Sequence, residues 1–177
     1  MMENVGKNPR NEPLEIERKF LIAMPTRDDL ERESSGRIEI TQIYLCPGAA
    51  GENRRIRLSR VDGREIRYYT EKLSLTDRTR IEREREITSA EWEALAKEAD
   101  PRRRPIEKVR WRVPYAGHVL EIDVFPFWQD RAFCEAELAS EEEELLLPSW
   151  LRVIREVTED PRYTNSALAR EIPCETL

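Results

Sequence analysis

Apolar and charged residues alternate along much of this chain, a pattern typical of β-strands with one buried face and one polar face. The alternation predicts strands at roughly 14–22, 37–46, 54–61, 65–73, 79–88, 106–114, 118–126 and 132–139. Asp62-Gly63 and Ala116-Gly117 separate two pairs of these runs and match two-residue connections between neighbouring antiparallel strands. Eight short strands separated by turns predict a sandwich or a barrel.

Helical spacing replaces the alternation in three places. The clearest helix is predicted from Thr88 to Ala99, where Thr88 and Glu91 are spaced as a capping box and Trp92 and Leu95 follow at helical intervals. This helix should cover an apolar surface. The other two predicted helices are shorter, and they span about 26–35 and 165–170.

Charged residues gather on one face of the predicted strands. Glu15, Glu17 and Lys19 share a face of the first strand, whereas Ile16 and Phe20 take the other. Acids cluster in the first and last strands, bases in the third, fourth and sixth, and the fifth carries both. For any single strand, a solvated face with cross-strand ion pairs explains the pattern. A surface selected only for solubility would intersperse its signs, however, so the blocks of like charge favour a binding face.

Composition narrows the function. The chain has 177 residues and a net charge of -6, which predicts one domain (14–177) after a short flexible lead (1–13) and disfavours nucleic acid as a partner. Three separated cysteines give neither a disulfide framework nor a thiolate zinc site. One histidine, His118, excludes a histidine metal cluster and a Ser-His-Asp triad. No apolar stretch suggests a membrane segment, so we expect a cytoplasmic protein.

The two kinds of charge suit two partners. Arginine presents a planar fork of donors that matches phosphate oxygens. Carboxylates are the ligands that Mg²⁺ and Mn²⁺ prefer, and Mg²⁺ is typically held by few carboxylates together with substrate phosphates. An eight-stranded sheet curled around this face would enclose one small ligand. The pattern therefore indicates a lumen for a polyphosphate and a divalent cation.

At this point the chain resembles the CYTH, or triphosphate tunnel metalloenzyme, superfamily. Glu15, Glu17 and Lys19 match its Glu-x-Glu-x-Lys signature. One departure is Leu73, which follows Lys72 where many members have glycine. The other matching elements, which extend the resemblance over about 14–170, are R-I-R at 55–57, T-E-K at 70–72, R-I-E-R-E-R-E-I at 80–87, K-V-R at 108–110, L-E-I-D-V-F at 120–125, E-A-E-L at 135–138 and E-V-T-E-D-P-R-Y-T-N at 156–165.

The resemblance implies a mainly β fold, an eight-stranded antiparallel closed barrel with a few covering helices, and a metal-dependent phosphohydrolase. Its implied metal ligands, for Mg²⁺ or Mn²⁺, are Glu15, Glu17, Asp123, Glu135 and Glu137, with Glu82, Glu84 and Glu121 as supporting acids. Its implied phosphate-binding residues are Lys19, Arg55, Arg57, Lys72, Arg80, Lys108 and Arg110. Glu15, Glu17, Lys19 and Lys72 are the expected catalytic residues.

Inorganic triphosphate, cleaved to diphosphate and phosphate, is the expected substrate because the charged face offers no evident aromatic platform for a ring. Tyr68 and Phe125 fall on that face by parity, and stacking by either would favour a thiamine triphosphatase or a class IV adenylyl cyclase. A non-catalytic polyphosphate-binding module is the alternative from another class, but simple binding needs bases more than acids. A homodimer is a further expectation, since few helices are available to cover the outer apolar face.

Overall fold

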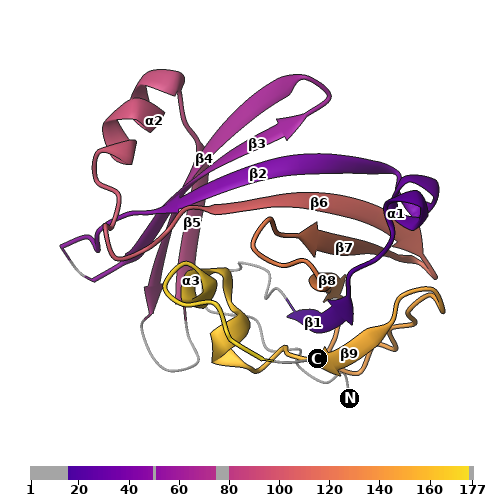
Figure 1. The fold of residues 1–177 in the computed structure, drawn as a ribbon. Coiled ribbons are helices and arrows are strands. Elements are labelled where there is room, and N and C mark those ends of the chain that lie inside the picture. Colours follow the sequence, from indigo (N-terminus) through magenta and orange to yellow (C-terminus); the bar gives the residue numbers. More distant parts are fainter. Residues whose placement is uncertain (1–15, 50, 75–79, 176–177) are drawn as a thin grey trace, which may run out of the picture.

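The computed structural model describes residues 16–49, 51–74 and 80–175, with only the backbone described at 73, 74 and 80–82. Within these residues the chain forms one antiparallel sheet of nine strands in the order β5-β4-β3-β2-β6-β7-β8-β1-β9 (Figure 1). The strands are β1 (Ile16–Ala23), β2 (Gly36–Tyr44), β3 (Asn53–Val61), β4 (Arg64–Ser74), β5 (Arg80–Glu86), β6 (Ile106–Tyr115), β7 (His118–Val124), β8 (Arg131–Leu138) and β9 (Val153–Glu156).

The eight predicted strands are all present, with ends within a few residues of the predicted ones. Both predicted hairpin connections are confirmed. Asp62 and Gly63 have φ angles of 50° and 73°, and Ala116 and Gly117 have φ angles of 47° and 86°. Two successive residues with positive φ match the twist of the flanking strands, which explains glycine at the second position of each turn. The ninth strand, β9, was not predicted.

Three α-helices and one 3-10 helix accompany the sheet in the described part of the chain: α1 (Arg27–Glu33), α2 (Ser89–Ala96), η1 (Pro161–Tyr163) and α3 (Asn165–Leu168). The α2 capping box is confirmed, since the Thr88 side chain accepts from the Glu91 backbone N–H and the Glu91 side chain accepts from that of Thr88. Thr26 is the N-cap of α1, where its side chain accepts from the Asp29 N–H. No helix among the described residues is long and apolar enough to span a membrane.

The apolar face of the sheet carries two clusters, each completed by a helix. One lies on β1, β6, β7 and β8, includes Trp111, and is joined by Leu30 of α1. The other surrounds Ile56 of β3, where Trp92 and Leu95 of α2 pack against it. Trp92 and Trp111 are therefore packing residues. The two clusters hold α1 and α2 on the side of the sheet opposite to the charged residues.

A third apolar cluster fills one end of the charged face. Leu21, Ile106 and Phe133 point to this face by strand register, and Tyr163 of η1 and Leu168 of α3 pack onto them. Figure 1 shows η1 and α3 lying against this end of the curled sheet. The charged positions are thus confined to the remaining part of the face.

The backbone hydrogen bonds do not close the sheet within the described residues. There β5 and β9 are the two edges, and no ladder joins them. The mainly β, antiparallel fold with covering helices is as predicted, with nine strands in place of eight.

Candidate functional site

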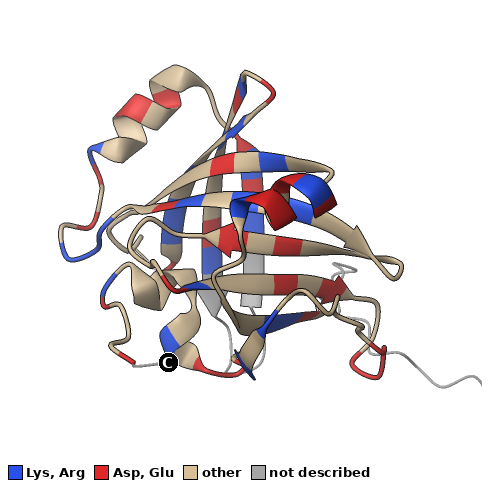
Figure 2. Ribbon diagram, turned by 45° about the vertical axis from the view of Figure 1, so that its right-hand side comes forward, with Lys and Arg blue, Asp and Glu red and all other residues tan. Residues whose placement is uncertain are grey.

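The strand register brings the predicted charged residues together on one face. Lys19 lies opposite Glu135 and Glu17 opposite Glu137 in the β1–β8 ladder, and Glu121 faces Glu135 between β7 and β8. Figure 2 shows bands of acidic and basic positions on these neighbouring strands. Charged residues far apart in the sequence therefore meet on adjacent strands.

Arg110 is the centre of a network that joins three strands. Its guanidinium donates to Asp123 from Nε (2.7 Å) and Nη2 (2.8 Å), to Glu135 from Nη2 (2.9 Å), and to Glu121 from Nη1. Lys108 donates to Asp123 Oδ2, the oxygen that also accepts from Arg110 Nη2. Asp123 is completely buried, so its charge is held by two cations and not by water.

Burial and nearby charges shift the pKa values of two carboxyl groups around Arg110 in opposite directions. Burial alone would raise the pKa of Asp123, but the charges and hydrogen bonds of Lys108 and Arg110 outweigh it and lower that pKa to about 2. The pKa of Glu121 is raised because its burial outweighs the attraction of Arg110. Lys108 and Arg110 therefore keep Asp123 ionised, while the raised pKa of Glu121 lets it hold a proton more readily than a free carboxyl group.

Lys19 adds a further buried ion pair, with its Nζ 2.7 Å from Glu135 Oε1. Glu135 therefore accepts from both Lys19 and Arg110. Glu17 and Glu137, one row further along β1 and β8, are exposed and directly opposite each other. Like charges placed directly opposite repel, so this pair of glutamates favours a cation between them.

The strands β3 and β4 carry the basic side of the face. Arg57 Nη2 lies 3.1 Å from Glu84 Oε1, and the buried Thr70 donates to the other oxygen of Glu84 at 2.8 Å. Arg55 lies opposite Thr70 in the β3–β4 ladder, and Lys72 lies one row further along the same face of β4. This side therefore presents three half-buried cations close to one partnered carboxylate.

Three predicted residues cannot be placed in this arrangement. Glu15 lies outside the described residues, and the side chains of Arg80 and Glu82 on β5 are also outside the description. The remaining predicted residues all lie on the charged face by register.

No three Asp, Glu, His or Cys side chains already converge on a cation position in the described ranges. The donor chemistry nevertheless fits a hard divalent cation, because Glu17 and Glu137 supply carboxylate oxygens from facing positions. Mg²⁺ commonly uses one or two protein carboxylates and takes further oxygens from substrate phosphates. The residues thus fit a cation that is bound together with a phosphorylated substrate.

The two candidate ring-stacking residues both make contacts within the fold. Phe125 is 1% exposed and lies in an aromatic cluster with Phe127, Trp128 and Phe133. The Arg57 guanidinium covers a face of the Tyr68 ring at 4.9 Å from its centroid. Phe125 is therefore a packing residue, and Tyr68 orients an arginine.

Two buried polar residues on this face, Gln42 and Tyr44 of β2, were not predicted from the sequence. Gln42 lies opposite Arg57 and Tyr44 opposite Arg55, and the Gln42 side-chain amide donates to the Tyr44 hydroxyl at 2.7 Å. Their parity was available from the sequence. However, Ile38 and Ile40 share that face of β2, so the strand did not show the charge alternation of its neighbours.

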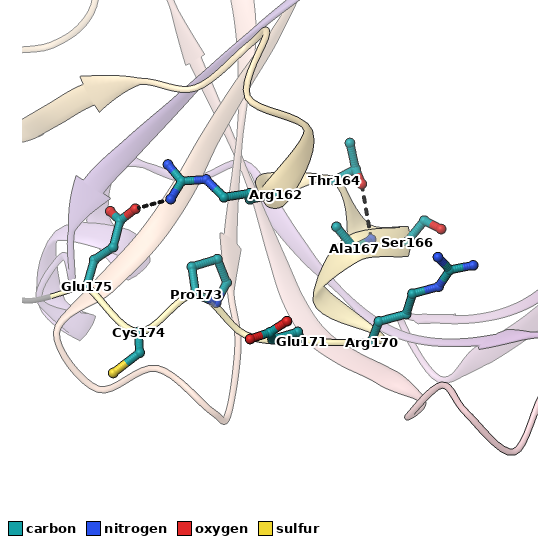
Figure 3. Close-up of a pocket in the computed structure, with 9 residues that line it drawn as sticks. All are labelled: Arg162, Thr164, Ser166, Ala167, Arg170, Glu171, Pro173, Cys174 and Glu175. Atoms are coloured by element: carbon teal, nitrogen blue, oxygen red, sulfur yellow. Dashed lines mark hydrogen bonds and ion pairs between the residues drawn. The ribbon is translucent and has the colours of Figure 1, made fainter.

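A pocket of about 690 Å³ lies at the C-terminal side of η1 and α3 (Figure 3). None of the predicted site residues lines it. Its acidic and basic lining residues include Arg162 and Glu175, which are paired with each other at 3.0 Å. The charged face of the sheet, rather than this pocket, therefore has the composition of a phosphate and metal site.

Comparisons with known proteins show that the chain is similar to inorganic triphosphatases. No family model matches the chain. It is 33% identical over 164 residues to the inorganic triphosphatase of Nitrosomonas europaea, covering 90% of this chain and 99% of that protein. It is 30% identical over 157 residues to the inorganic triphosphatase of Acetivibrio thermocellus, covering 88% and 93%. The crystal structure of an inorganic triphosphatase matches with a TM-score of 0.56 at 28% identity, over 90% of this chain and 99% of that chain.

Proposed function

This chain belongs to the CYTH, or triphosphate tunnel metalloenzyme, superfamily and is an enzyme that hydrolyses a triphosphate, and on that premise we propose that its substrate is inorganic triphosphate. The observation that carries the choice is the charged face itself. It gathers cations and carboxylates on adjacent strands, while Phe125 is buried and one face of the Tyr68 ring is already covered by Arg57. Such a face recognises phosphates and offers no evident site for a base or a thiazole ring.

The bases would bind and orient the phosphates. Arg55, Arg57 and Lys72 lie on β3 and β4, near one edge of the sheet. Lys19 lies on β1, near the other edge. Cations that surround a phosphoryl group neutralise it and stabilise the charge that develops on the leaving group. These side chains therefore carry the electrostatic part of the reaction.

A curled face is needed to bring the two sides together around one substrate. We propose that the sheet encloses a lumen, as the tunnel of the superfamily implies, with the β3–β4 bases facing the acids of β1 and β8. Support comes from the packing of η1 and α3 onto the same face as the charged residues. In this proposal, that packing closes one end of the lumen with apolar residues, so the phosphates bind nearer its other end.

A divalent cation, Mg²⁺ or Mn²⁺, would be held by Glu17 and Glu137, with Glu15 and Glu135 as neighbouring acids. When bound, the cation would neutralise phosphate oxygens and assist attack by water. In the proposal Asp123 is not a direct ligand, since Oδ1 already accepts from Arg110 and Oδ2 from both Lys108 and Arg110. Asp123 instead keeps these two bases in place beside Glu135.

The activity is tested with purified protein, inorganic triphosphate, ATP and thiamine triphosphate, each with Mg²⁺ or Mn²⁺. Phosphate, pyrophosphate and cyclic AMP are assayed. We expect phosphate release from inorganic triphosphate at the highest kcat/KM. Cyclic AMP as the main product, or faster cleavage of thiamine triphosphate, would replace the proposed substrate, and no turnover of any of them would refute the proposal.

The metal role is tested by Glu17→Gln, which removes a charge at nearly constant volume. We expect the Mn²⁺ concentration for half-maximal activity to rise by about tenfold or more, since one ligand is weakened. The matched control is Glu39→Gln, because Glu39 is exposed on the opposite face of β2. An unchanged metal requirement in Glu17→Gln would remove Glu17 from the cation site.

A further inference from the structure

Arg103, in the loop between α2 and β6, has a buried side chain although no predicted site motif includes it. Its side chain is 8% exposed, whereas that of the neighbouring Arg102 is 75% exposed. Both arginines pair with the buried Asp100. Arginine is rarely buried unless its donors are engaged, so the contacts of Arg103 indicate what it holds.

Arg103 joins β2, β3 and α3. Its guanidinium lies over the ring of Tyr44, 5.0 Å from the centroid. Its Nη1 donates to Asn53 Oδ1 at 3.3 Å and to Ser166 Oγ at 3.1 Å. Ser166 is among the residues drawn in Figure 3, on the side of α3 next to Arg170. One planar group therefore contacts an aromatic ring and two polar side chains at once.

Two of these contacts border the proposed phosphate-binding bases. Tyr44 lies opposite Arg55 in the β2–β3 ladder, and Asn53 lies opposite Lys72 in the β3–β4 ladder. Arg55 also hydrogen-bonds the Tyr44 hydroxyl, which accepts a second hydrogen bond from Gln42. The residues that Arg103 holds are thus the direct neighbours of Arg55 and Lys72.

We propose that Arg103 is a positioning residue for triphosphate binding, which fixes Tyr44 and Asn53 and through them Arg55 and Lys72. This inference rests on the proposed function. Two cations that converge on one anion repel each other when the anion is absent, so their geometry depends on the groups around them. A misplacement of about 1 Å at such a site can lower the rate by ~100-fold. The planar guanidinium suits this role because it stacks and donates in fixed directions.

The test compares Arg103→Met with Arg102→Met. Both variants remove one positive charge beside Asp100, but only the first removes the contacts with Tyr44, Asn53 and Ser166. Affinity for inorganic triphosphate is measured by calorimetry without metal, and kcat and KM are measured with Mg²⁺. We expect Arg103→Met to weaken binding and raise KM by about tenfold, or ~1.4 kcal/mol, and Arg102→Met to change both by less than about twofold.

Arg103→Lys separates geometry from charge, because lysine keeps the charge but has no planar fork. We expect it to recover little of the lost affinity. Full recovery in Arg103→Lys would overturn the positioning role in favour of a simple charge effect, and equal behaviour of Arg103→Met and Arg102→Met would also overturn it. If Arg103→Met does not fold, Asn53→Ala replaces it, and wild-type affinity in Asn53→Ala would contradict the proposal.

The two proposals fail in different ways. If the wild-type protein does not cleave triphosphate yet binds it, the proposed function is wrong and calorimetry still tests Arg103. If the wild-type protein cleaves triphosphate and Arg103→Met does so with unchanged KM and affinity, only the role of Arg103 is wrong. Absence of both binding and cleavage in the wild type overturns both.

Discussion

At the scale of single residues, Arg110 shows how much one side chain organises. It contacts Asp123, Glu121 and Glu135 on two further strands. Parity in the sequence placed these residues on one face. Which acid meets which base depends on the strand register and on how far each side chain extends toward the neighbouring strands. The pairing was therefore not predictable, although the gathering of charge was.

The buried position of Asp123 makes its charge important for stability. Asp123→Asn leaves Lys108 and Arg110 without their shared carboxylate in a buried site, so we expect the free energy of unfolding to fall by ~3–5 kcal/mol. Urea denaturation measures this. Glu65→Gln, in an exposed pairing with Arg60 and Arg67, is the control and should change stability little. Comparable effects of the two substitutions would contradict the importance of burial.

At the scale of elements, alternation and turn chemistry were sufficient for eight strands and both tight hairpins. The missed strand, β9, spans only Val153–Glu156, and both Arg155 and Glu156 are charged. It pairs with β1 through a register shift between Leu21 and Ile22. A strand of four residues has too few positions to show a period of two, so pairing with β1 is what defines it.

The capping box of α2 is the element-scale feature most open to test. Thr88→Ala removes the hydroxyl that accepts from the Glu91 N–H, and we expect the free energy of unfolding to fall by about 1 kcal/mol. Ser89→Ala, one position further along, should have an effect within about 0.5 kcal/mol. Thermal and urea unfolding of both variants provide the measurement. A larger loss in Ser89→Ala than in Thr88→Ala would contradict the assigned cap.

At the scale of the whole molecule, one sheet separates packing from charge. Its outer face is apolar beneath α1 and α2, and its other face is charged except where η1 and α3 pack on it. The sequence predicted both faces by parity. It did not predict the apolar end of the charged face, because residues from η1, α3 and five strands meet there only in the folded chain.

Charge pairing in the interior should also set the response of the whole fold to acid. The pKa of Asp123 falls from 3.8 to about 2 on folding. Its contribution, ~2 kcal/mol, is therefore fully present above about pH 4 and is lost as the pH falls toward 2. Urea unfolding measured across this range should show a shallower loss of stability in Asp123→Asn than in the wild type. If stability fell with pH to the same extent in Asp123→Asn and in the wild type, Asp123 would not be a source of the acid sensitivity.

The place of β1 in the sheet also orders the events of folding. This strand carries Glu17 and Lys19 and is made early, yet it pairs with β8 (Arg131–Leu138) and β9 (Val153–Glu156), which leave the ribosome late. Contacts between segments so distant in the chain form slowly because a long loop must close first. During synthesis, Glu17 and Lys19 therefore emerge before their partner strands, and the charged face is completed only after β8 and β9 have emerged.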